Sequence, residues 1–182
     1  MKKHQTIACC GLDCGLCPRY YTNGSSRCGG CGGYNFAGNP SCWVLNCCVK
    51  KGFEVCGQCS DYPCERLRNT VKIGCDSFTT HKKIIPNIED IKANGLEQFL
   101  DKQRIRINIL EYLLSRHDDG RSKGFFCISC TLLPIDKLQE IRQAAEKMVD
   151  KVEWKDRCKL LRVMLKEIAD PLSIELKLIK KR

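Results

Sequence analysis

The chain has 182 residues, of which 43% are hydrophobic and 29% are charged, and these proportions are typical of a soluble globular protein. No stretch is apolar enough to cross a membrane, and no apolar signal segment precedes Cys9, so a cytoplasmic protein is expected. The formal net charge is +10, but this count treats every cysteine as neutral. Two zinc ions, each held by four thiolates with a net charge of −2, would lower the total from +10 to +6.

The cysteines are concentrated at one end of the chain, where 13 of the 16 lie within the first 80 residues. Two residues between cysteines is the spacing of a zinc knuckle, in which the backbone turns and both thiolates reach one ion. A reducing cytosol keeps thiols free, so this density predicts metal binding rather than disulfides. The spacing runs Cys10-x3-Cys14-x2-Cys17, Cys28-x2-Cys31, Cys42-x4-Cys47-Cys48 and Cys56-x2-Cys59-x4-Cys64.

A change of composition near residue 80 predicts two parts. Residues 8–64 are rich in Cys and Gly and poor in aliphatic side chains, so a bound metal must supply the core there. We therefore expect a cysteine-rich metal-binding module over residues 1–80 and a helical half, packed on it, over residues 81–182. The predicted fold class is mostly α, with a small, metal-stapled and loop-rich N-terminal module.

The first predicted helix covers residues 61–71, with Asp61 as its N-cap and Pro63 in its first turn. Residues 82–87 are predicted to be a linker, broken by Pro86. Apolar side chains recur at helical spacing over residues 96–114, 134–149 and 154–168, which predicts three amphipathic helices. The short apolar run 125–128 has no assigned state, and strict alternation over residues 172–178 predicts a short C-terminal strand.

Spacing leaves the grouping of the cysteines into sites open. Cys14 and Cys17 with Cys28 and Cys31 have the spacing of a compact zinc ribbon, and a second site could combine residues 42 and 47 with 56 and 59. Cys10 and Cys64 are then left over, so the pairing could instead interleave. Cys9, Cys48, Cys75 and Cys158 are predicted to be packing residues. Cys127-x2-Cys130 could complete a metal site, but its apolar neighbours favour two core residues.

The predicted function is metal binding, with two or more zinc ions forming the structural core of an interaction module for an unidentified protein partner. One alternative is an iron–sulfur protein for electron transfer or redox sensing, because Cys10, Cys14 and Cys17 could hold three irons of a cluster. A second alternative is a nucleic-acid-binding zinc protein with a basic end at residues 177–182. The colour of the purified protein distinguishes the first two, because iron–sulfur proteins are brown and zinc proteins are colourless. The salt dependence of nucleic-acid binding tests the third, because contacts to phosphate weaken as salt rises.

Binding to nucleic acid is not expected to be tight. Residues 81–182 carry 22 basic and 16 acidic side chains, so their excess charge is spread over helices that also carry acids. The aromatic residues Phe99, Phe125 and Phe126, together with Trp154, lie on predicted apolar faces or runs and are expected in the core, and no alternation of aromatic and basic residues typical of a single-strand binding surface is present. The histidines, at positions 4, 81 and 117, fall in predicted loops, and no catalytic constellation is visible, so an enzyme is not predicted.

The segment from Ala8 to Pro18 resembles the opening of the domain of unknown function 3795 family, as do Cys56-x2-Cys59 and the segment 61–64. The segment from Asp119 to Pro134 also resembles longer members of that family. The resemblance implies zinc-binding cysteines and no particular reaction, and Cys9 and Cys48 stand outside its pattern. The ligands that it implies are Cys10, Cys14, Cys17, Cys28, Cys31, Cys42, Cys47, Cys56, Cys59 and Cys64.

Overall fold

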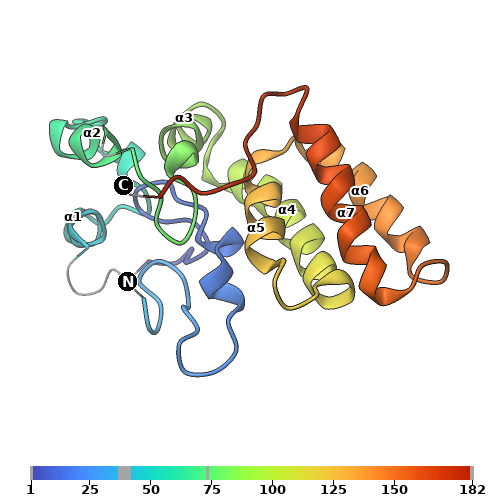
Figure 1. The fold of residues 1–182 in the computed structure, drawn as a ribbon. Helices are drawn as coiled ribbons and strands as arrows, with labels where there is room; N and C mark the ends of the chain where they lie inside the picture. Colours follow the sequence, from blue (N-terminus) through green and yellow to red (C-terminus); the bar gives the residue numbers. More distant parts are fainter. Residues whose placement is uncertain (1, 37–41, 73, 181–182) are drawn as a thin grey trace. The chain divides into compact units, whose positions relative to one another are not determined.

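The computed structural model of the protein describes residues 2–36, 42–72 and 74–180, so Lys181 and Arg182 of the basic end lie outside the described residues. The described residues form mainly α-helices joined by loops, with a loop-rich N-terminal region, which confirms the predicted fold class (Figure 1). None of the helices searched is long and apolar enough to span a membrane.

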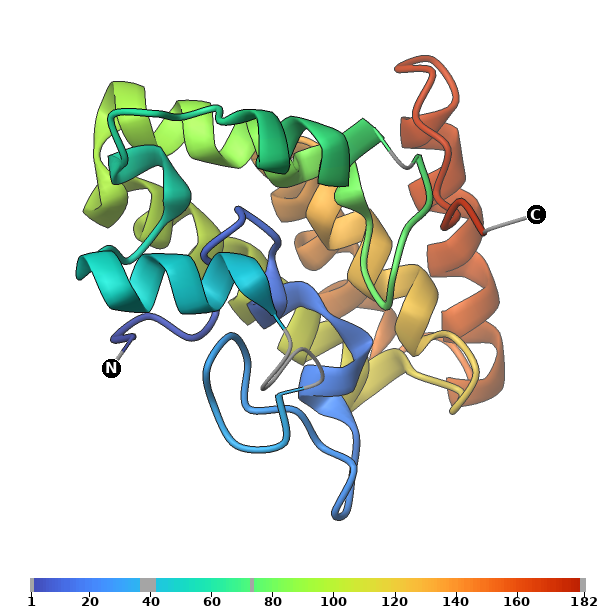
Figure 2. The ribbon, with the colours of Figure 1, turned by 90° about the vertical axis from the view of Figure 1, so that its left-hand side faces the viewer.

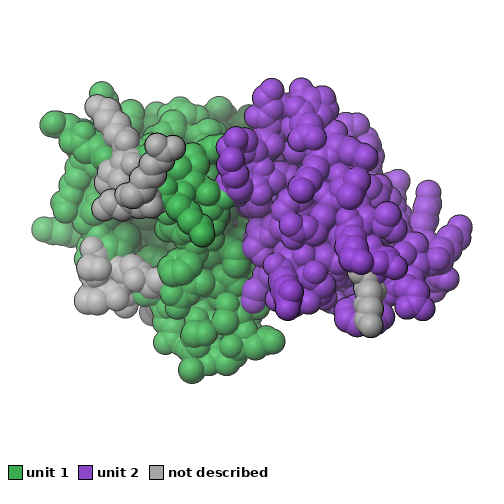
Figure 3. Space-filling model, in the orientation of Figure 1, with its two compact units in different colours: residues 1–101, 178–182 green, residues 102–177 purple. Residues whose placement is uncertain are grey.

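The chain divides into two compact units (Figure 3). Unit 1 contains Met1–Asp101 and Leu178–Arg182, and unit 2 contains Lys102–Lys177. The predicted module over residues 1–80 lies wholly within unit 1. Its separation from a helical half that begins at residue 81, made on composition, stays a prediction.

Unit 1 is built from short helices around an N-terminal turn. Ile7, Ala8 and Cys9 share one hydrophobic cluster with side chains of α1 and α3, and the turn lies between these two helices (Figures 1 and 2). The elements are η1 (Cys14–Leu16), η2 (Pro18–Tyr21), α1 (Trp43–Lys51), η3 (Cys56–Gln58), α2 (Glu65–Lys72), η4 (His81–Lys83), α3 (Ile84–Asn94) and the beginning of α4 (Leu96–His117).

Helix α1 was not expected inside the cysteine-rich segment. It buries Val44, Leu45 and Cys48 on one face, which is the spacing of an amphipathic helix. It ends at Gly52, whose φ of 73° is left-handed and whose N–H donates to the carbonyls of Cys48 and Val49. Helix α1 therefore places one cysteine, Cys48, against the core of unit 1.

Two predicted boundaries in unit 1 are wrong. Helix α2 begins at Glu65 rather than near Asp61, whose carboxylate lies 3.6 Å from the Lys51 ammonium instead of capping a helix. The predicted linker 82–87 is the end of η4 and the start of α3. Pro86 lies in the first turn of α3, where a missing N–H costs no intrahelical hydrogen bond. The buried Asn87 amide then donates to the Gly11 carbonyl and the Asp13 carboxylate, both at 2.8 Å, and fixes the N-terminal turn on α3.

Unit 2 contains the rest of α4 together with α5 (Lys123–Leu132), α6 (Ile135–Met148) and α7 (Trp154–Ala169). Helices α6 and α7 lie side by side (Figure 1). The three helices predicted from periodicity are present, and the unassigned run 125–128 lies within α5. The large side chains of unit 2 that are fully buried are Leu110, Leu113, Phe126, Leu133, Leu138, Ile141, Leu161 and Leu165.

Details of unit 2 test the remaining sequence predictions. Cys127, Cys130 and Cys158 are buried, as expected of packing residues. The prediction that Trp154 is a core residue is wrong: its side chain is 58% exposed, because it begins α7. The described residues contain no strand, and their one isolated β-bridge joins Ile7 to Asp13, so the short C-terminal strand stays a prediction.

His117 lies at the end of α4 rather than in a loop, and it is 3% exposed with no hydrogen-bond partner on either ring nitrogen within the described residues. Burial lowers its pKa, and the charges of Arg157, Arg116 and Arg142 lower it further. Acid therefore favours the unfolded chain, whose histidine protonates below about pH 6.5.

We expect His117→Phe to raise the free energy of unfolding near pH 7.5 by about 1 kcal/mol, because it removes unpaired buried polar atoms. The variant should also lose less stability than the wild type as the pH falls from 7.5 toward 5. Urea unfolding at the two pH values measures both effects. An unchanged pH dependence would show that His117 is protonated equally in both states.

Candidate metal centre

Backbone contacts hold the N-terminal turn and the Cys28-x2-Cys31 knuckle together. The Cys31 N–H donates to the Gln5 carbonyl at 2.9 Å, and the Gly15 N–H donates to the Thr6 carbonyl at 2.7 Å. Gly30, with φ of +88°, packs so closely that a Cβ atom there would lie 2.2 Å from the Gln5 carbonyl oxygen. Only glycine fits this approach. The loop that carries Cys28 and Cys31 is therefore fixed against residues 5–15.

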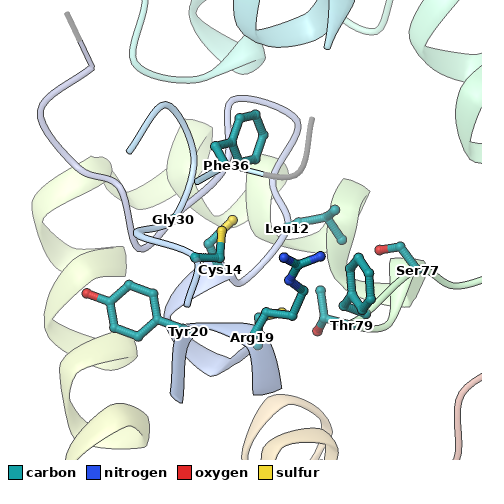
Figure 4. Close-up of a pocket in the computed structure, with 11 residues that line it drawn as sticks. Leu12, Cys14, Arg19, Tyr20, Gly30, Phe36, Ser77 and Thr79 are labelled. Carbon is teal, nitrogen blue, oxygen red and sulfur yellow. The ribbon is translucent and has the colours of Figure 1, made fainter. Parts of the chain in front are cut away.

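Three predicted ligands, Cys14, Cys17 and Cys28, line one cavity of about 310 Å³ in unit 1, and we name them the cavity thiols. Two knuckles thus contribute to the same space. Figure 4 shows Cys14 and Arg19 facing that space, and the Arg19 guanidinium also lies 4.7 Å from the centre of the Phe78 ring. The cavity therefore combines sulfur donors, one cation and aromatic surface.

The surroundings of these sulfurs decide their protonation. Burial raises the pKa of Cys14 well above its ordinary value, and the neighbouring thiols of Cys10, Cys17 and Cys28 raise it further. Burial also raises the pKa of Cys17, against the effect of a hydrogen bond from the Arg19 N–H, and it raises that of Cys10 to about 12. These thiols become thiolates only beside a strong positive charge, which a bound metal ion supplies.

Four further thiols meet in the core of unit 1, and we name them the buried thiol row: Cys9, Cys31, Cys48 and Cys56. The Cys9 sulfur is in hydrogen-bonding contact with Cys31 and with Cys48, and Cys48 is in the same contact with Cys56. These contacts lower the pKa of Cys9 to about 4 and that of Cys56 to about 7, while they raise the pKa values of Cys31 and Cys48. The row joins four different segments between residues 9 and 56.

The remaining predicted ligands are more dispersed. Cys59 accepts a hydrogen bond from the Lys51 ammonium at 3.2 Å, and the exposed Cys47 also acts on that ammonium. Cys42 lies close enough to Cys10 to raise its pKa. Cys64 is partly buried and packs against the hydrophobic cluster of unit 1.

The donors fit zinc or iron in their chemistry, because thiolate is the ligand that tetrahedral zinc and iron–sulfur clusters prefer. As they stand, no three His, Cys, Asp or Glu side chains of the described residues are grouped so as to hold a metal ion. The thiols form a set around a cavity and a row in the core.

The sequence pattern separates Cys28 and Cys31 from Cys9 and Cys48, whereas in the structure Cys31 contacts Cys9, which in turn contacts Cys48. No spacing rule links Cys9 to the other knuckles. The one signal in the sequence is that Cys9 and Cys48 each adjoin a predicted ligand, Cys10 and Cys47.

Comparison with known proteins supports the resemblance noted in the opening cysteine pattern. The model of the family described as "Protein of unknown function (DUF3795)" matches residues 6–69. No curated protein and no solved structure matches the chain. The match does not reach residues 119–134, so the resemblance there stays a prediction. The family model thus matches the cysteine-rich part of the chain, which contains both thiol groups.

Proposed function

We propose that residues 1–80 bind zinc through cysteine thiolates, and that the ions act as the structural core of an interaction module. The observation that carries the proposal is the meeting of Cys14, Cys17 and Cys28 at one cavity. Cys10, which acts on Cys14, is the natural fourth donor. Zinc bound by four cysteines is a closed, structural arrangement that contributes directly to folding.

The scarcity of apolar core in this segment supports a structural role for the metal. In residues 2–64 the buried side chains other than cysteine are few, and the aliphatic ones are Ile7, Ala8, Leu16, Val44, Leu45 and Val55. Segments of this size with a small core are usually stabilised by disulfides or metal ions. Exposed aromatic side chains beside the knuckles, Tyr34 and Phe78, support a role in binding a partner, since aromatic residues are enriched at interfaces.

An iron–sulfur cluster is the second candidate, and the size of the cavity favours it. About 310 Å³ is roughly ten times the share of one water molecule in the liquid, and a single zinc ion needs far less. Cys10, Cys14 and Cys17 supply three sulfurs for such a cluster, and Cys28 a fourth.

We expect at least two metal ions per chain in protein purified anaerobically without chelator, and we expect the metal to be zinc. Elemental analysis by mass spectrometry measures both quantities. A brown protein that contains iron and sulfide would transfer the cavity thiols to the second candidate. Less than one ion of any kind per chain would contradict metal binding altogether.

A further inference from the structure

The buried thiol row is the strongest cluster of metal-binding side chains outside the cavity. Its members are only 1% exposed for Cys9 and Cys31, 2% for Cys48 and 7% for Cys56. Cys9 comes from the N-terminal turn, Cys31 from the Cys28-x2-Cys31 knuckle, Cys48 from α1 and Cys56 from η3. Four segments thus contribute one sulfur each to the same buried cluster. Packing alone does not require that all four small side chains be cysteine.

The contacts among the sulfurs correspond to part of a tetrahedral site. With zinc–sulfur bonds of about 2.3 Å, neighbouring sulfurs of a tetrahedron lie about 3.8 Å apart, which is the range of a thiol–thiol hydrogen bond. Three of the six edges of such a tetrahedron are already present as contacts, from Cys9 to Cys31, from Cys9 to Cys48 and from Cys48 to Cys56.

Only weak hydrogen bonds link these sulfurs, because a thiol is a weak donor and its sulfur is a weak acceptor. The Cys48 thiol contacts both Cys9 and Cys56. The Lys2 charge acts on Cys9, but its ammonium already binds the Glu54 carbonyl at 2.7 Å and carboxylate at 3.2 Å. A divalent cation would satisfy all four sulfurs at once.

Backbone hydrogen bonds hold the segments that carry the row in place. The Cys56 N–H donates to the Cys9 carbonyl at 2.7 Å, and the Cys31 N–H donates to Gln5. Cys48 lies within α1, where its position is fixed by the helix. The three contacts join the four sulfurs in series, so a closed site requires the side chains to rotate toward a common centre.

We propose that Cys9, Cys31, Cys48 and Cys56 form a second, closed zinc site of four thiolates, separate from the cavity thiols. The site includes two cysteines, Cys9 and Cys48, that lie outside the family's pattern. The site deepens the proposed function and rests on it for the identity of the ion, but its ligands differ from those at the cavity.

The test uses the full chain, purified anaerobically in reductant. The zinc is removed stepwise with increasing chelator, and each stage is treated with iodoacetamide and digested for peptide mass spectrometry. We expect the four cysteines of the buried thiol row to become alkylated together, in step with the loss of one ion. The cavity thiols should become alkylated with a different ion. Cys130, which is buried in unit 2, is the internal control and should stay unlabelled.

A pair of variants gives a second readout. Cys48→Ser should carry one zinc fewer per chain than the wild type, whereas Cys158→Ser, which changes an equally buried helical cysteine of unit 2, should carry the same number. Zinc in the wild type with unchanged content in Cys48→Ser would overturn this site and leave the proposed function standing. Alkylation of the row before any zinc is lost, or a disulfide within it, would overturn the site as well. A wild type without zinc would refute both proposals.

Discussion

Complete removal of metal by a chelator is expected to unfold unit 1 and to leave the helices of unit 2 protected from hydrogen exchange. A structural zinc site supplies about 10 kcal/mol or more of binding free energy, which is comparable with the whole stability of a typical domain. Unit 2 has its own core of eight fully buried large side chains, none of them a proposed ligand, for example Leu110, Phe126 and Leu161.

Hydrogen exchange followed by mass spectrometry resolves the two units, since peptides from residues 42–72 and from residues 135–169 report on each. The control is the same protein in reductant without chelator, which separates loss of metal from reduction of any disulfide. Unchanged protection of α1 and α2 after the metal has gone would show that the apolar cluster of unit 1 is sufficient by itself. Loss of protection in both units together would show that unit 2 depends on the metal.

Replacement of Gly30 by alanine should have a large effect on stability although it keeps every thiol. The new Cβ atom would lie 2.2 Å from the Gln5 carbonyl oxygen, and the backbone would keep a left-handed φ of +88°. Because the clash is with backbone, the knuckle loop must move away from residue 5, and Cys28 and Cys31 move with it. We expect a loss of about 3 kcal/mol or more of stability, and weaker zinc binding at both thiol groups.

Gly24→Ala is the matched control, because Gly24 also has a left-handed φ, +85°, but nothing lies within 4 Å of a Cβ atom there. It should cost only the strain of the left-handed backbone, about 1 kcal/mol, and should leave the zinc content unchanged. Thermal melting and competition with a zinc chelator measure the two quantities. Equal effects of the two variants would mean that the contact between residues 5 and 30 does not position the knuckle.

The amphipathic helices of unit 2 could be predicted from the sequence because their apolar residues repeat at a period of 3.6 over three or more turns. Helix α5 could not, since an apolar run as short as 125–128 fits a buried strand as well as a helix. Helix α1 is not predicted because its cysteines fit the pattern of metal knuckles. The spacing of Val44, Leu45 and Cys48 and the glycine at residue 52 are nevertheless helix signals. Asp61 could not be recognised as a partner of Lys51, because that pairing depends on how α1 and η3 fold together.

The contacts within the candidate site also depend on the fold rather than on local sequence. Spacing predicts the knuckles, but it could not predict which sulfurs meet. Neighbouring residues of an extended turn point to opposite sides, and neighbouring residues of a helix lie about 100° apart. Cys10 therefore faces Cys14 and Cys42 while Cys9 faces the buried row, and Cys47 is exposed while Cys48 is buried. Interleaving, which the sequence left open, is the arrangement that the contacts of Cys31 favour.

Residues 178–180 return to unit 1, where the N–H and carbonyl of Ile179 pair with the carboxylate and N–H of Asp76, both at 2.8 Å. Unit 2 is therefore an insert between two pieces of unit 1, and the chain passes between the units twice. A single cut after Asp101 leaves residues 178–180 covalently attached to unit 2 and still hydrogen-bonded to unit 1, so this cut alone does not separate the two units. Recombinant production of unit 1 as a single fragment 1–101 would lack the Ile179 pairing of Asp76. Joining residue 101 to residue 178 through a short artificial connection would preserve it.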